Sequence, residues 1–257
     1  MDGRLRTPTR RSARVDGVPA LHIDGDVAVL RLERPAEHNR IDPDDIPLLR
    51  AHLKTVLRTR DVRALVITGS GTRTFSSGYT VDAIADRLDR GFEDLLDSIE
   101  HFPLPTLCAL NGSVYGGATD LALCCDFRIG VRGSRMFMPS ARFGLHYYPG
   151  GLRRYVGLLG AAQAKRLFLT AQTIDADEML RIGFLTELVP KKALTATIEA
   201  YLDAIRACNA DVVRSMKKQI DRIAGGDREA AQSRTAYERS LRSPALRMRL
   251  AALRSRR

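Results

Sequence analysis

The stretch Asn111-Gly-Ser-Val-Tyr-Gly-Gly-Ala-Thr-Asp120 separates two short apolar runs of the chain, residues 106–110 and 118–124. The first run is predicted to be a buried strand that stops at Asn111-Gly112, and the second is predicted to be a short helix. The glycines Gly116 and Gly117 come immediately before that helix. The stretch therefore predicts a strand, a glycine-rich loop and a helix in immediate succession.

A second junction of this kind lies upstream, in Phe75-Ser-Ser-Gly-Tyr79. It comes after the predicted buried strand of residues 64–68, which ends in Gly69-Ser-Gly. Glycine tolerates unusual backbone angles, and N–H groups at the start of a helix have no intrahelical acceptor. Two such N–H groups facing each other would polarise a carbonyl and stabilise the oxyanion formed from it. The alternative is that both junctions are ordinary turns.

Strands and helices alternate through the first part of the chain. Predicted strands cover residues 27–32, 64–68, 106–110 and 126–131, and predicted helices cover residues 44–58, 81–99 and 118–124. From about Leu152 onward the pattern is wholly helical, including residues 175–181 and the long stretch after Lys191. This order predicts an α/β fold with an α-helical C-terminal subdomain.

The chain has 257 residues, of which 44% are hydrophobic, and this is enough for one sizeable core. No apolar run reaches the roughly 18 residues that a membrane-spanning helix needs. Residues 1–14 are basic and contain no apolar segment, so we expect a disordered tail and no secretory signal. Asp2 and Pro8 weaken the alternative of an organellar presequence.

Four cysteines occur, and none forms a C-x-x-C pair: Cys108, Cys124, Cys125 and Cys208. We expect reduced thiols, no metal site and a reducing, cytoplasmic compartment. The formal net charge of +11 suits an anionic partner, which could be nucleic acid, a membrane surface or a phosphorylated ligand. Much of this charge lies near the two ends of the chain, so solvated tails are the alternative.

Several common functional motifs are absent from the sequence. It has no G-x-G-x-x-G after a strand, no phosphate loop that ends in Gly-Lys-Ser/Thr, and no H-E-x-x-H. It also lacks G-x-S-x-G, the signature of common serine hydrolases. These absences leave the two glycine junctions as the main candidates for chemistry.

Four segments resemble one known family in their order and spacing: Arg63-Ala-Leu-Val-Ile-Thr-Gly-Ser-Gly with Phe75-Ser-Ser-Gly, residues 111–129, Arg142-Phe-Gly-Leu with Pro149-Gly-Gly-Leu-Arg-Arg, and residues 169–190. The chain is similar to the crotonase (enoyl-CoA hydratase/isomerase) superfamily over roughly residues 21–240. The resemblance implies a crotonase-type ββα spiral core over residues 15–190, after the basic tail of residues 1–14. It also implies a helical trimerisation region over residues 191–257.

The resemblance also implies roles for residues at the two junctions. The backbone N–H groups of Tyr79 and Gly117 would form the oxyanion hole of the family. The substrate, a CoA thioester, would lie along the following residues: Ser77, Gly78, Thr80, Val81, Gly116 and Ser140. The family usually has Ala where this chain has Tyr79 and Asp where it has Thr80. The bulkier Tyr79 would narrow the acyl pocket or cover the thioester.

The acid–base residues depart from the pattern of the family's hydratases. Asp120 stands where they have a Glu, and its carboxylate is pulled back by about 1.5 Å, out of hydrogen-bond reach of the same substrate atom. Its alternative role is structural, because a carboxylate in the first turn stabilises the N-terminus of a helix. Ser140 stands at the second Glu position, and Tyr148 stands near the acid of some isomerases and dehalogenases. Neither can act as a carboxylate base, which argues against hydration.

One branch of the family, the methylmalonyl-CoA decarboxylase-like members, resembles this chain in Gly-Ser-Val-Tyr-Gly-Gly-Ala and in a tyrosine at the position of Tyr147. Loss of CO2 from a malonyl-type thioester needs no base, and it leaves an enolate for the oxyanion hole to stabilise. Tyr147 would orient the leaving carboxylate, with His146 or Asp120 as the proton donor. The alternatives are aromatic packing for Tyr147 and no role for His146.

From these residues we predict an acyl-CoA-processing lyase that stabilises a thioester enolate, such as a malonyl-type-CoA decarboxylase. Two alternatives stay open: an enoyl-CoA hydratase or isomerase that uses Asp120 alone, and a non-catalytic RNA-binding or scaffold protein of the same fold. We expect no cofactor beyond the CoA of the substrate, self-association as a homotrimer or dimer of trimers, and neither a membrane nor a nucleic-acid partner. The family's usual C-terminal residues for the CoA phosphates are missing, and arginines such as Arg247 and Arg249 could replace them.

Overall fold

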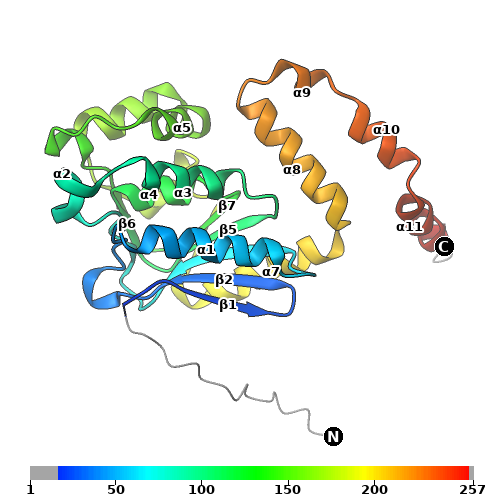
Figure 1. Cartoon of the computed structure of the whole chain (residues 1–257), viewed down its shortest axis with the longest axis horizontal. Helices are drawn as coiled ribbons and strands as arrows, with labels where there is room; N and C mark the ends of the chain where they lie inside the picture. The colour runs from blue at the N-terminus through cyan, green and yellow to red at the C-terminus, as the bar shows by residue number, and fades with distance from the viewer. Residues whose placement is uncertain (1–16, 255–257) are drawn as a thin grey trace, which may run out of the picture.

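The computed structural model describes residues 17–254, which form two β-sheets, helices packed against them, and a C-terminal series of helices (Figure 1). The larger sheet has the strand order β1-β2-β3-β5-β7-β10, and all neighbouring strands are parallel except β1 and β2. Its strands are β1 (Ala20–Asp24), β2 (Val27–Leu32), β3 (Ala64–Gly69), β5 (Thr106–Leu110), β7 (Phe127–Val131) and β10 (Glu187–Val189). Four of these confirm the strands predicted from the sequence, with bounds that differ by at most one residue.

The smaller sheet has the strand order β4-β6-β8-β9. Its strands are β4 (Thr74–Ser76), β6 (Ser113–Tyr115), β8 (Arg135–Phe137) and β9 (Ile174–Asp175). β4 follows β3, β6 follows β5 and β8 follows β7, so the chain passes from the larger sheet to the smaller one three times. This repeated passage agrees with the predicted ββα spiral.

Helices cover both faces of the larger sheet. The main hydrophobic core lies on one face and receives side chains from α1 (Asp45–Arg58), α3 (Arg90–Glu100), α4 (Gly117–Leu123) and α5 (Pro149–Thr170). On the other face, Ile198 and Leu202 of α7 (Leu194–Ala207) belong to a second apolar cluster with strand residues such as Leu107. Strands covered on both faces need apolar side chains along their whole length, which explains why their runs are continuous rather than alternating.

The remaining helices are α2 (Ile84–Arg87), α6 (Ala176–Arg181), α8 (Ala210–Ala224), α9 (Arg228–Gln232), α10 (Thr235–Leu241) and α11 (Pro244–Arg254). Figure 1 shows that α8 to α11 lead away from the two sheets. Within residues 17–254, no helix combines the length and the hydropathy that crossing a membrane requires.

The single helix predicted over residues 81–99 is interrupted in the structure. α2 ends at Arg87, Leu88 has extended backbone angles, and α3 begins at Arg90. The Asp89 carboxylate accepts a hydrogen bond from the Gly91 N–H at 2.7 Å, and this cap starts a new helix. The prediction missed the break because the apolar periodicity continues across it.

The prediction that the chain is wholly helical from about Leu152 is wrong, because β9 and β10 lie beyond that residue. These strands have two and three residues, too few for an alternating pattern to be visible in the sequence. After β10, the described residues form helices and no further strand. The division into residues 15–190 and 191–257 stays a prediction, and the tail of residues 1–14 lies outside the described residues.

Candidate active site

The two glycine junctions meet because β4 and β6 pair in parallel. Gly78 has a φ of +83°, in the left-handed region that side chains disfavour. A Cβ atom at this position would lie 2.6 Å from the backbone nitrogen of Gly117 and 2.9 Å from that of Ala118. Only glycine therefore fits at position 78, where the two loops cross. This close approach explains the glycine in the junction Phe75-Ser-Ser-Gly-Tyr79.

The backbone N–H groups of Tyr79 and Gly117 are neighbours. A Cβ atom built on Gly117 would lie 3.7 Å from the Tyr79 nitrogen. Within the described part of the chain, neither N–H donates to a backbone acceptor. Residues on either side of Tyr79 are held by Ile41, whose N–H donates to Gly78 O at 2.8 Å and whose carbonyl accepts from Thr80 N at 3.0 Å. Two adjacent free donors have the chemistry of an oxyanion hole, and that role stays a prediction.

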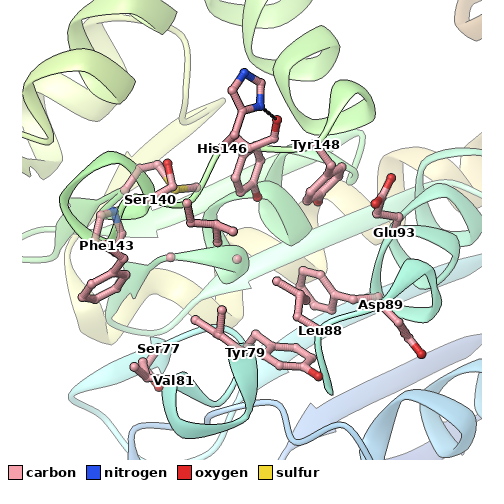
Figure 2. A pocket seen from close by; sticks show the side chains of 18 of the residues that line it. Ser77, Tyr79, Val81, Leu88, Asp89, Glu93, Ser140, Phe143, His146 and Tyr148 are labelled. Atoms are coloured by element: carbon pink, nitrogen blue, oxygen red, sulfur yellow. Dashed lines mark hydrogen bonds between the residues drawn. The ribbon is translucent and has the colours of Figure 1, made fainter. Parts of the chain in front are cut away.

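A cavity of about 370 Å³ opens beside these two residues (Figure 2). Most of its lining is apolar or aromatic: Val81, Ile84, Leu88, Phe92, Met138, Phe143, Leu145, Tyr147 and Tyr148 contribute, besides Tyr79 itself. Ser77, Val81, Gly116 and Ser140, four of the residues expected along the substrate, line the cavity. An apolar cavity with a few polar groups is typical of a small-molecule site.

The two other residues expected along the substrate do not line the cavity. Gly78 is buried where the two loops cross. The Thr80 hydroxyl accepts a hydrogen bond from Arg40 Nη1 at 2.9 Å and donates to the Ile41 carbonyl at 3.2 Å. Both residues therefore shape the loop that presents the Tyr79 N–H.

Asp120 is fully buried and does not line the cavity. Both of its carboxylate oxygens bind Arg154 of α5, with Nε 2.8 Å from Oδ1 and Nη2 3.0 Å from Oδ2. The Tyr148 hydroxyl also donates to Oδ2. A bidentate ion pair of this kind holds both oxygens in place, so the geometry favours a structural role for Asp120 over that of a free acid or base.

Arg154 joins three elements of the core. Besides Asp120 of α4, its guanidinium binds Asp97 at 2.9 Å and Glu100 at 2.8 Å, both in α3. Burial lowers the pKa of Arg154, but the hydrogen bond and the charge of Asp120 outweigh it and raise the pKa above its ordinary value. Burial and then the negative charge of Asp120 raise the pKa of Tyr148, so this phenol stays protonated and keeps its bond to the carboxylate.

Tyr147 lines the cavity with its ring, while its hydroxyl is buried and has no hydrogen-bond partner within residues 17–254. The ring lies in an aromatic cluster with Tyr148, Tyr155 and Phe168. Burial raises the pKa of the Tyr147 phenol well above its ordinary value, so the hydroxyl is protonated. Aromatic packing is therefore established for Tyr147, and the predicted contact with a substrate carboxylate stays a prediction.

His146 is exposed at the edge of the cavity. Its Nδ1 lies 2.8 Å from the Tyr147 carbonyl, and in Figure 2 the imidazole points away from the cavity. A role as proton donor would require this side chain to turn inward. Such a role stays a prediction that the present geometry does not favour.

The side chain of Tyr79 forms one wall of the cavity, as its size led us to expect. Its hydroxyl donates to the Arg87 carbonyl at 2.7 Å, and its ring packs edge-on against Phe92 with the centroids 5.4 Å apart. The residue is buried, so it narrows the space beside its own N–H group.

The sequence did not single out Arg154 or the two carboxylates that line the cavity, Asp89 and Glu93. Arg154 lay in a segment that resembled the family, but nothing local marked it as the partner of Asp120. Glu93 follows the buried Phe92 and borders the apolar face of α3. This position beside the apolar face is the feature of the sequence that could have indicated a side chain lining the cavity. In Figure 2, Glu93 lies on the same side of the cavity as Tyr148, and Ser140 and Phe143 lie on the other side.

Comparison with known proteins supports the resemblance seen in these motifs. The family model described as enoyl-CoA hydratase/isomerase matches residues 22–244, most of the chain. The chain belongs to this family. The crotonase resemblance is thereby confirmed, whereas the narrower likeness to methylmalonyl-CoA decarboxylases is not shown.

Two relatives whose names state an activity are similar to the chain over most of its length. It is 30% identical to the crotonyl-CoA hydratase of Syntrophomonas wolfei over 220 residues, which cover 79% of this chain and 84% of that protein. It is also 30% identical to the short-chain-enoyl-CoA hydratase of Clostridium acetobutylicum, over 77% of this chain and 78% of that one.

Solved structures agree with the fold. An enoyl-CoA hydratase from Bacillus anthracis superimposes with a TM-score of 0.83 at 22% identity, covering 93% of this chain and 96% of that one. DspI of Pseudomonas aeruginosa superimposes with a TM-score of 0.81 at 25% identity, covering 96% and 98%. The crotonase fold is therefore shared over nearly the whole chain.

Proposed function

We propose that the protein is a hydratase or isomerase that acts on an enoyl-CoA thioester. A thioester enolate is the intermediate of the proposed reaction. The observation that carries this proposal is the pair of free N–H groups, Tyr79 and Gly117, beside an apolar cavity. Donors aimed at the carbonyl oxygen would stabilise the negative charge that develops there, and removing one such donor costs about 10²–10³ in kcat in other enzymes.

The relatives support the substrate class. The two relatives described above are named for hydrating crotonyl-CoA and short-chain enoyl-CoA. The cavity volume of about 370 Å³ lies toward the lower end of the range for ligand pockets, which suits a short acyl group. These names favour the hydratase or isomerase alternative over the lyase that the sequence suggested first.

Malonyl-type decarboxylation is a second candidate, because the Tyr147 hydroxyl has no partner within the described residues. A buried unpaired hydroxyl costs about 1–3 kcal/mol, and a substrate carboxylate that reached it would remove that cost. The reaction also needs no carboxylate at Ser140 or Asp120. Its products distinguish it clearly from hydration, since CO2 leaves instead of water being added.

We further propose that the protein assembles with itself, as a homotrimer or dimer of trimers, and works in a reducing, cytoplasmic compartment without a cofactor. Large apolar side chains are exposed on α8, α10 and α11, and a second copy would cover them: Met216, Ile220, Ile223, Tyr237, Leu241, Met248 and Leu250. Three of the cysteines are buried and all four have free thiols, which suits such a compartment.

The decisive experiment is a panel of CoA thioesters containing crotonyl-CoA, 3-butenoyl-CoA and methylmalonyl-CoA. Mass spectrometry detects gain of water or loss of CO2, and chromatography detects a shift of the double bond. We expect product from crotonyl-CoA or 3-butenoyl-CoA. A preparation that turns over no thioester and instead binds RNA in a salt-sensitive manner would contradict the proposal.

Gly78→Ala tests the N–H pair directly. Its Cβ would push against the Gly117 nitrogen, so we expect kcat to fall by about 100-fold. Gly133→Ala is the matched control, because Gly133 also has a positive φ, +82°, but its Cβ would meet no atom within 4 Å. Both variants place alanine at a similar positive φ, so only a loss of activity specific to Gly78→Ala supports the oxyanion hole.

A further inference from the structure

Glu93 comes from the part of α3 that touches the proposed oxyanion hole. The preceding residue, Phe92, has a ring atom only 2.8 Å from where a Cβ of Gly117 would lie. The same ring packs against Tyr79. The first turn of α3 is therefore fixed against both residues whose N–H groups face the cavity, and Glu93 lies in that turn.

Glu93 has no bound partner. Within residues 17–254 its carboxylate makes no hydrogen bond and no ion pair, although it is half-buried and lines the cavity. The three other acids of α3 each bind a guanidinium: Asp94 binds Arg50, and Asp97 and Glu100 bind Arg154. Glu93 therefore differs from its neighbours in keeping its carboxylate free.

The other acids near the cavity are occupied. Asp89 Oδ1 accepts a hydrogen bond from the Gly91 N–H at the N-terminus of α3. Asp120 binds Arg154 and Tyr148. Ser140 and Tyr148 stand where a second acid was sought, and neither carries a carboxylate. A proton-transfer group must lie in the cavity with its carboxylate available. Of the two acids that line the cavity, Asp89 already caps α3, whereas both oxygens of Glu93 are unbound within residues 17–254.

We propose that Glu93 is the catalytic base and acid of the reaction and that it shifts the double bond of a 3-enoyl-CoA, an inference that rests on the proposed function. The carboxylate takes a proton from the α-carbon, and the C–H electron pair moves into the thioester to give an enolate. Tyr79 and Gly117 donate to the enolate oxygen. The protonated Glu93 then returns its proton to the γ-carbon, which yields the 2-enoyl-CoA with no net change in atoms or electrons.

This chemistry fits the residues present, because one carboxylate suffices to move a proton from one carbon to the next. Hydration in the family's usual manner uses two carboxylates, and the positions of both have changed in this chain. The structure therefore favours a double-bond shift over the addition of water, and it assigns that step to a helix on which the sequence motifs place no catalytic residue.

Glu93→Gln tests the proposal with little change in shape. Two rates are measured: conversion of 3-butenoyl-CoA to crotonyl-CoA, and uptake of solvent deuterium at the α-carbon of butyryl-CoA. We expect both to fall by about 100-fold or more, with the dissociation constant for butyryl-CoA within threefold of that of the wild type. Glu93→Asp should retain part of the activity, because it keeps the carboxylate.

Asp94→Asn is the matched control, since it removes one carboxylate from the same helix at an exposed position beside Arg50. It should leave both rates unchanged. Glu93→Gln with rates within threefold of wild type would overturn the role of Glu93 and leave the proposed function intact. A wild-type protein that hydrates crotonyl-CoA, but shifts no double bond and exchanges no α-proton, would also overturn that role alone. A wild-type protein that only decarboxylates methylmalonyl-CoA would overturn both the role of Glu93 and the proposed function. A wild-type protein that acts on no thioester would overturn both proposals.

Discussion

Asp120 and Arg154 form a buried ion pair in which both carboxylate oxygens and two guanidinium nitrogens are used. Taking two charges out of water is costly, and the pair persists because each charge finds matched partners. The guanidinium of Arg154 binds both oxygens of the Asp120 carboxylate, and the Tyr148 hydroxyl also donates to Oδ2. Asp120 therefore belongs to the packed core and not to the lining of the cavity.

Asp120→Ala should lower the free energy of unfolding by about 1–3 kcal/mol, because Arg154 and Tyr148 would lose a buried acceptor while Asp97 and Glu100 still bind the guanidinium. Urea denaturation of the purified protein measures this. Arg153→Gln is the control: Arg153 binds Glu100 at a half-exposed site and should cost less than about 1 kcal/mol. Unfolding free energies for Asp120→Ala that match the wild type would show that the pair contributes nothing to stability.

At the scale of elements, the break between α2 and α3 determines which side chains reach the cavity. In a continuous helix Leu88 would lie on the same face as Ile84, whereas the extended backbone at Leu88 and the cap at Asp89 start α3 as a separate helix. The result is a first turn that places Phe92 against Gly117 and Glu93 beside the cavity. The break between the two helices therefore contributes to the lining of the candidate site.

The stability contributed by the ion pair between Arg166 of α5 and Glu178 of α6 should depend on pH. Hydrogen bonds from Arg181 and Arg166 lower the pKa of Glu178 from 4.5 to about 2. Because the folded-state pKa is lower than that of the unfolded chain, ionised Glu178 stabilises the fold above pH 4.5 and loses this effect as the pH falls toward 2.

We therefore expect Glu178→Gln to be less stable than the wild type at pH 7, by at most about 1 kcal/mol since the site is near the surface. The difference should shrink as the pH falls below about 4.5. Urea denaturation at pH 7, 5 and 3.5 measures it. Asp177→Asn, at the neighbouring exposed pair with Arg132, should have a smaller effect at pH 7. A difference that grows toward low pH would contradict the assignment.

At the scale of the whole molecule, α8 to α11 extend beyond the two sheets and carry an unpaired apolar surface (Figure 1). Met216, Ile220 and Ile223 recur at intervals of four and three residues, so they lie on one face of α8, and all three are exposed. This apolar stripe is the surface that we propose a second copy of the chain covers.

Analytical ultracentrifugation should find a mass of three or six times 28.5 kDa. Ile220→Lys should shift the protein toward smaller species, because a charge in an apolar contact is left without a partner. Leu57→Lys introduces the same charge at an exposed apolar residue of α1 and should leave the assembly unchanged. A wild-type protein that sediments as a monomer would exclude the proposed trimer.

The sequence by itself determined four of the six strands of the larger sheet, the two glycine junctions and the family. A strand covered on both faces needs a continuous apolar run, and a crossing such as that at Gly78 accepts only glycine, so both features leave local marks. At these junctions the family resemblance pointed to the N–H groups of Tyr79 and Gly117, and the structure brings these two residues together.

Only the tertiary structure decided which carboxylates are free. Asp120 was a candidate from its place after Gly117, but its state depends on Arg154, 34 residues further along the chain. Glu93 was passed over because nothing in its neighbourhood marks a missing partner. Whether an acid is paired or free depends on side chains brought together from distant elements, and no local pattern carries that information.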